Sequence, residues 1–142
     1  MRQPLSHRLA GLATAATMLA LLTCQPPPIG VEVRWEGSTP IFHFEKPDRG
    51  CWFDGDWEVS QLRVWEDADD SDADRGTLVW DIYGPGTHEA IRFGSVPPDW
   101  SQQAPAIGEF PQLSAGIAYS VDVGDSYGHD GHARFRAPEA RP

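Results

Sequence analysis

The feature that most constrains the fold is an alternation of apolar and polar residues that begins at Val31 and recurs through the rest of the chain. Successive side chains of a β-strand point to opposite faces, so a period of two predicts strands with one buried face. No stretch after residue 30 has sustained helical spacing. We therefore predict seven strands, over residues 31–35, 42–44, 62–65, 78–82, 91–93, 119–123 and 133–135.

Glycine-containing and proline-containing turns separate these strands, and residues 97–112 hold four prolines that predict a long irregular crossover. Seven short alternating strands in about 110 residues are typical of an all-β domain with two antiparallel sheets packed as a sandwich. A small β-barrel is the alternative fold.

One strand carries a more specific pattern, in which Leu113 and Gly116 precede Tyr119 and an alternating run to Val123. This segment resembles the start of strand F in fibronectin type III and related immunoglobulin-like domains. The resemblance implies an immunoglobulin-like sandwich, in which the tyrosine hydroxyl hydrogen-bonds to the chain upstream and fixes the corner between the sheets.

The chain begins with Arg2, His7 and Arg8, followed by 14 uncharged residues from 9 to 22 and then Thr23 and Cys24. A basic start before a short apolar stretch is typical of an export signal, and 14 residues are too few to span a bilayer as a helix. The ending resembles the lipobox of bacterial lipoprotein precursors. That resemblance implies that Cys24 is lipidated and becomes the first residue of the mature protein. Plain cleavage near the same point is the alternative.

Residues 24–30 follow as the lipidated cysteine and a stiff proline-rich stalk, since Pro26–Pro28 favour an extended conformation. We expect a β-sandwich domain over residues 31–137 and a loose tail over 138–142. In the lipoprotein family an Asp after the cysteine favours the inner membrane, and Gln25 stands there instead. The resemblance thus implies an outer-membrane anchor in a bacterial cell envelope, with the domain in the periplasm or at the cell surface.

Acidic side chains dominate the charge. The full chain has a formal net charge of −10; all 21 acidic residues follow Cys24, whereas Arg2 and Arg8 precede it, so the mature part carries −12 before histidine is counted. Such a charge opposes binding to the phosphate backbone, which excludes nucleic acid as a partner. It favours a basic protein partner or a cation. We expect no cofactor.

A second cysteine, Cys51, begins an aromatic segment that contains Trp52 and Trp57. Lipidation of Cys24 would leave Cys51 unpaired as a buried side chain, whereas a free Cys24 would allow a disulfide between the two. We expect Trp57 to lead into the core and Trp52 to cover its edge. A contact role for both tryptophans is the alternative, because exposed tryptophans anchor sugars or protein partners. Six tryptophans exceed the needs of a small core, so we expect at least one on the surface.

The most conspicuous polar segment, residues 66–76, holds a run of carboxylates. Asp70, Asp72 and Asp74 stand at positions 1, 3 and 5 of a loop with Asp81 at position 12, a spacing similar to a calcium-binding loop. Arg75 occupies the position where that loop needs glycine. We expect a solvated acidic hairpin loop, with a calcium site as the alternative.

A histidine-containing turn lies between the last two predicted strands. His129, Asp130 and His132 have donor atoms that suit a transition metal, and His43 or His88 would have to supply a third imidazole. The flanking glycines favour a flexible hairpin, with the metal site as the alternative.

No nucleophile elbow, phosphate-binding glycine loop or zinc-binding helix motif occurs in the sequence, and we expect no enzymatic activity. The function that fits these observations is a small binding or structural module anchored to the envelope membrane by its acyl chains. The alternative is an immunity-type or inhibitor lipoprotein that neutralises a basic periplasmic toxin or hydrolase, because the negative charge would steer it toward a basic partner.

Overall fold

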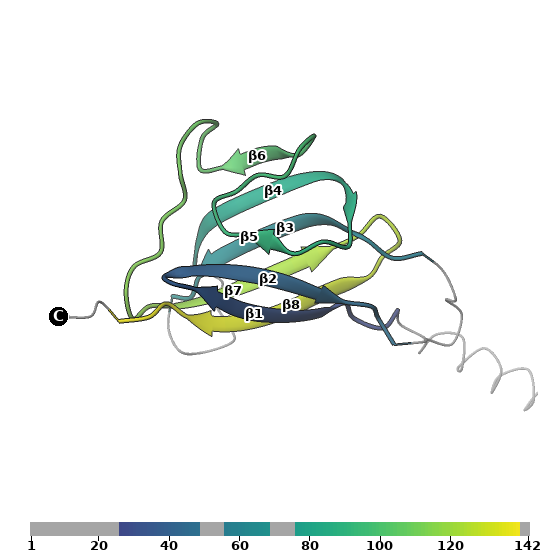
Figure 1. The fold of residues 1–142 in the computed structure, drawn as a ribbon, viewed down its shortest axis with the longest axis horizontal. Helices are drawn as coiled ribbons and strands as arrows, with labels where there is room; N and C mark the ends of the chain where they lie inside the picture. Colours follow the sequence, from purple (N-terminus) through teal and green to yellow (C-terminus); the bar gives the residue numbers. More distant parts are fainter. Residues whose placement is uncertain (1–25, 49–55, 69–75, 140–142) are drawn as a thin grey trace, which may run out of the picture.

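Two antiparallel sheets make up the fold of the computed structural model, which describes residues 26–48, 56–68 and 76–139 (Figure 1). The smaller sheet has the strand order β1-β2-β5 and the larger has the order β6-β4-β3-β7-β8. The strands are β1 Gly30–Glu36, β2 Thr39–Glu45, β3 Val59–Glu66, β4 Thr77–Thr87, β5 Ile91–Arg92, β6 Ser101–Ala104, β7 Ala118–Gly124 and β8 Asp130–Arg136. The two sheets are separate and do not close into a barrel, so the fold is the predicted β-sandwich.

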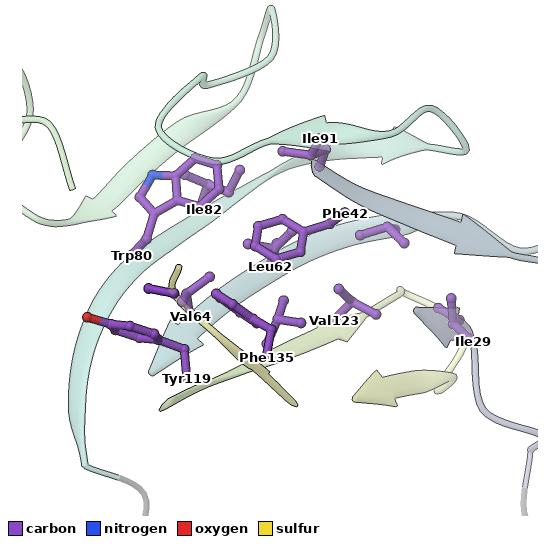
Figure 2. Packing of buried hydrophobic residues seen from close by; sticks show 13 residues of the cluster. Ile29, Phe42, Leu62, Val64, Trp80, Ile82, Ile91, Tyr119, Val123 and Phe135 are labelled. Carbon is purple, nitrogen blue, oxygen red and sulfur yellow. The ribbon is translucent and has the colours of Figure 1, made fainter. Parts of the chain in front are cut away.

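The predicted alternation places the core side chains correctly in most strands. Leu62 and Val64 of β3 are fully buried, and so are Tyr119 and Val121 of β7. Each buried aliphatic or aromatic side chain contributes roughly 1.5–3 kcal/mol of hydrophobic stabilisation. Figure 2 shows Leu62, Val64 and Tyr119 among the buried side chains. The whole cluster consists of Ile29, Phe42, Val59, Leu62, Val64, Trp80, Ile82, Ile91, Tyr119, Val121, Val123, Phe135 and Ala137.

The alternation over residues 78–82 predicts Leu78, Trp80 and Ile82 on one face, and the structure differs at Leu78. Val64 pairs with Trp80, whereas the next residue, Trp65, pairs with Leu78, so one extra residue is accommodated between these pairs. Such a bulge reverses the faces beyond it. As a result Val79 packs against the core, and Leu78 shares the opposite face with Trp65.

The structure has eight strands among the described residues rather than the predicted seven, because β6 lies inside the proline-rich crossover. It pairs antiparallel with β4 and is the edge strand of the larger sheet. The sequence Ser-Gln-Gln-Ala has no apolar alternation, and only its backbone pairing makes it a strand. The described residues include no helix long and apolar enough to cross a membrane.

The hydrogen bond expected of Tyr119 is present. The backbone N–H of Ser114 donates to the tyrosine hydroxyl at 2.8 Å, five residues upstream of the start of the alternating run. Tyr119 also stacks on Phe135 of β8, with ring centroids 5.6 Å apart. This side chain therefore fastens the end of the crossover to the core, and Figure 2 shows its hydroxyl at the margin of the cluster.

The chain segments just before β1 and just after β8 also belong to the folded domain. Ile29, in the segment assigned to the stalk, is buried, and its N–H donates to the carbonyl of Asp130 at 2.7 Å. At the other end Ala137 is buried and its N–H donates to Ile117. Both chain segments are thus bonded to the sandwich at these positions.

Candidate functional site

An open groove of about 460 Å³ lies on the side of the sandwich where β6 ends the larger sheet. The smaller sheet is two strands narrower, and its β1 contacts β8 at the opposite side. Figure 1 shows β6 and the following crossover extending past β5. The groove is lined by Gly94, Val96, Trp100, Ser101, Gln102, Ile107, Gly108, Glu109 and Phe110.

Large apolar side chains in this groove are exposed to solvent. Ile107 is 88% exposed and Phe110 is 79% exposed, and Val96 is also exposed. Trp100 is half-buried beside them. Single exposed apolar residues are common, whereas a contiguous group is typical of a contact surface. This group has the composition expected of a site that binds another molecule.

The groove is held in shape by the side chain of Gln102. Its Oε1 accepts a hydrogen bond from the indole N–H of Trp80 in the core, at 3.2 Å. Its Nε2 lies 3.1, 3.3 and 3.0 Å from the carbonyl oxygens of Pro105, Ala106 and Glu109. One amide therefore connects the hydrophobic core to the loop that carries Ile107 and Phe110.

The Trp100 ring is fixed by a close approach to β4. A Cβ added at Gly84 would lie 2.5 Å from Cγ of Trp100, so any larger residue there would displace the indole. The N–H of Trp100 donates to the carbonyl of Pro97 at 3.2 Å, and that of Glu109 donates to Ala106 at 2.9 Å. These contacts preform the groove, which lowers the entropy cost of binding.

Carboxylates are the charged side chains on the crossover that lines the groove, and Arg92, two residues before Gly94, pairs with Glu36. Glu109 lines the groove, Asp99 precedes Trp100, and the chain contains no lysine or arginine from residue 93 to residue 133. A surface that combines apolar side chains with carboxylates is complementary to a partner with apolar and cationic groups.

A second cluster lies on the outer face of the larger sheet. Arg63 of β3 stands in register between Asp81 of β4 and Asp122 of β7, and His132 of β8 follows in the same row. The His132 Nδ1 lies 2.8 Å from the Asp122 carboxylate. A hollow of about 260 Å³ borders this row, and both Nε of Arg63 and Oδ1 of Asp81 are buried without a hydrogen-bond partner among the described residues.

The structure places the predicted histidine ligands in different surroundings. His129 is buried, and its Nδ1 lies 2.6 Å from the carboxylate of Asp125, which also accepts the N–H groups of Tyr127 and His129. His132 is exposed on the outer face and Asp130 is exposed beside it. No group of three or more His, Cys, Asp or Glu side chains in the described parts of the chain could hold a metal ion. His43 lies in β2 of the smaller sheet, and His88 contacts the Trp57 ring.

Of the predicted calcium ligands, Asp70, Asp72 and Asp74 lie outside the described residues. Asp81 lies within β4 on the outer face, as its predicted place in a strand requires. A neighbouring acidic residue, Asp67, has a structural role instead: Ser120 donates to its carboxylate at 2.6 Å, and Arg134 binds it at 3.0 and 3.1 Å.

The remaining predicted site residues include Cys24, Cys51 and Trp52, which also lie outside the described residues. Trp57 precedes β3, is half-buried and packs against the core, as expected. Its ring lies 4.7 Å from that of His88, whose Nε2 contacts the Trp57 carbonyl. None of the five described tryptophans is exposed.

Sequence reasoning missed the groove, although one signal for it was present. Ile107 and Phe110 are large apolar residues in a proline-rich segment with neither a strand nor a helix period. Residues of this kind without a period have no buried face to join, so they mark candidate contact positions. The sequence matches no known protein-family model and no curated protein.

Proposed function

We propose that this protein is a small binding module, tethered to a bacterial cell envelope by a lipid on Cys24, and that the groove beside β6 is its contact surface. The observation that carries this proposal is the exposure of Ile107 and Phe110 on a loop that Gln102 fastens to the core. A chain gains nothing for its own stability from apolar side chains left in water, and their ordered presentation suits recognition of a partner.

The chemistry of the groove suits binding. It offers apolar area, the indole of Trp100, and the backbone of an edge strand. Large aromatic side chains contribute contact area at small entropy cost, and they often dominate the energy of protein interfaces. The β-sandwich would act as the rigid support. Tyr119 begins a strand that lies between β3 and β8, as strand F lies between C and G in immunoglobulin-like domains, which supports membership of that structural class.

The anchor and the location rest on the residues up to Cys24. A basic start, a short apolar stretch and a lipobox-like end together support export and lipidation. The acyl chains of a lipoprotein exceed the two signals needed for stable attachment to a bilayer. Growth with labelled palmitate should label the wild-type chain and not Cys24→Ala, which should move to the soluble fraction. Equal fractionation of both chains would contradict the anchor.

The contact surface is tested by site-specific crosslinking in cells. A photoreactive phenylalanine analogue placed at position 110 should give a discrete adduct, and the same analogue at Tyr127, also exposed, should not. The adduct should disappear when Ile107→Ser is added, because loss of a neighbouring anchor weakens binding. An adduct pattern that is the same at both positions, or that ignores Ile107→Ser, would contradict the proposal.

The acidity of the chain favours a more specific version, an immunity-type or inhibitor lipoprotein that neutralises a basic periplasmic toxin or hydrolase. The charge of −12 on the part that follows the signal would raise the rate of association with a basic protein. In this version the captured partner is basic and its association slows as salt is added. A partner that is neutral or acidic, with binding indifferent to salt, would exclude it.

A further inference from the structure

Resting on the proposed function of the groove, we infer that its occupant is an extended segment of another protein that carries lysine or arginine and pairs with β6 as an additional strand. Recognition by strand addition uses backbone hydrogen bonds for affinity and side-chain pockets for specificity. Three observations on this side of the sandwich lead to that occupant: a strand edge, an apolar pocket beside it, and carboxylates on the crossover that lines the pocket.

The strand edge is the backbone of β6. One side of this strand pairs with β4, and its other side has no neighbouring strand among the described residues. The opposite edge of the larger sheet is different, because β8 is contacted by β1 and the Asp130 carbonyl accepts the N–H of Ile29. Open strand edges are templates for pairing with another chain. The edge at β6 is therefore the place in the larger sheet where an extended segment can add.

The pocket beside this edge indicates which side chains such a segment would need. Ser101 and Gln102 of β6 line the same groove as Trp100, Ile107 and Phe110. Alternate side chains of an added strand would point to the groove face, and the others to the outer face of the sheet. Apolar side chains on the groove face would cover Ile107 and Phe110, which are exposed in the chain by itself.

The carboxylates at the groove favour a basic segment over an acidic one. Glu109 lies in the groove and Asp99 is next to Trp100, whereas Arg92, two residues before Gly94, is already paired with Glu36. A cationic segment would gain attraction from both carboxylates and from the net charge of the chain, and an acidic segment would be repelled.

Defined peptides test this inference on the full chain carrying Cys24→Ala. We expect a fluorescent peptide of alternating lysine and valine to bind saturably, and a peptide of alternating glutamate and valine not to bind. Ile107→Ser with Phe110→Ser should weaken the binding about tenfold or more, as loss of two interface anchors does. Tyr127→Ser, an exposed aromatic away from the groove, is the matched control.

Backbone pairing is tested by methylating alternate peptide nitrogens. Methyl groups on the nitrogens of one edge should abolish binding, and those on the other edge should leave it unchanged, because only one edge of an added strand faces β6. Binding that ignores methylation on both edges, or no binding at millimolar peptide, would overturn strand addition. If the cellular crosslink at position 110 persists in that case, the contact surface stands and only this occupant fails.

Two other occupants give distinct results that would also overturn the inference. A lipid surface would make the Cys24→Ala chain sediment with phosphatidylcholine vesicles in a manner that depends on Phe110. A second copy of the chain would produce a dimer in analytical ultracentrifugation that Phe110→Ser dissociates. We expect the chain to remain monomeric and unbound to such vesicles.

Discussion

At the scale of single residues, the side chains that matter most are those that connect the irregular crossover to the core. The Tyr119 hydroxyl accepts from the backbone of Ser114, and Gln102 joins Trp80 to three carbonyls of the loop. The sequence predicted the first of these bonds because a tyrosine before an alternating run has a known structural setting. It did not predict the second, since nothing in the local sequence distinguishes Gln102 from Gln103.

Replacing Tyr119 by phenylalanine tests the tyrosine bond. The change keeps the ring in the core but leaves the Ser114 N–H without its acceptor, so we expect the free energy of unfolding to fall by about 1–3 kcal/mol. Tyr83→Phe on β4 removes a hydroxyl from a side chain that is 46% exposed, and should change it by less than about 0.5 kcal/mol. Urea unfolding of both variants measures the difference, and equal effects would contradict this role of Tyr119.

Two ion pairs illustrate why the identity of a charged residue does not reveal how much it contributes to stability. A hydrogen bond from Arg34 lowers the pKa of Glu32, and the same bond raises the pKa of Arg34, yet both side chains are exposed and contribute little in salt. The Asp67 carboxylate is nearly buried and is bound by both Ser120 and Arg134. Asp67 belongs to the acidic segment that the sequence assigned to a solvated loop, and only its partners on β7 and β8 distinguish it.

At the scale of elements, the period of two predicted the strands wherever one face is buried. It was wrong for Leu78, because a bulge depends on how two strands pair and cannot be recognised in the sequence of one strand. It missed β6, because an edge strand held by its backbone needs no apolar alternation. The groove was missed for a different reason. The crossover that forms it is shaped by hydrogen bonds of the Gln102 side chain to Trp80 and to the loop, which the sequence does not reveal.

The role of Gln102 in shaping the crossover leads to a measurable local effect. In Gln102→Ala the amide of Glu109, which donates to Ala106, should exchange its hydrogen faster by a larger factor than the amides of β7. Gln103→Ala, an exposed neighbour, should leave both rates unchanged. Hydrogen exchange followed by NMR measures this. An equal acceleration at Glu109 and in β7 would mean that Gln102 stabilises the whole fold and not the loop in particular.

For the acidic segment between β3 and β4 we expect no calcium binding. Asp81 stands within β4 on the outer face of the sheet, and the Asp67 carboxylate is already bound by Ser120 and Arg134, so neither carboxylate belongs to an open acidic loop. Millimolar calcium should therefore leave the Tm unchanged. A saturable rise in Tm that Asp72→Asn with Asp74→Asn abolishes would contradict this prediction, because an ion that binds only the folded state stabilises it.

At the scale of the whole molecule, the unequal width of the two sheets determines where the proposed contact surface lies. With β1 next to β8, the smaller sheet ends at the short strand β5 and leaves the β6 side to the crossover. Trp100 of that crossover and Phe93, which follows β5, pack against the core, whereas Ile107 and Phe110 of the crossover are exposed. In the function proposed above, stability and recognition thus depend on different apolar residues of one chain.

A matched pair of phenylalanines tests this division. Phe42 is fully buried, and Phe42→Ala should lower the free energy of unfolding by about 3–5 kcal/mol. Phe110→Ala should change it by less than about 0.5 kcal/mol, since the side chain is already in water. Denaturant unfolding distinguishes the two, and a comparable loss in both would mean that Phe110 belongs to the core.

The central claim, that the groove is the contact surface, is tested most directly by crosslinking from within it. A photoreactive residue is placed at Val96, an exposed residue that lines the groove, in the wild-type chain and in Phe110→Ala. We predict one discrete adduct in cells with the wild-type chain and its loss in Phe110→Ala, at equal protein levels. An adduct of the same yield in both chains would contradict the claim.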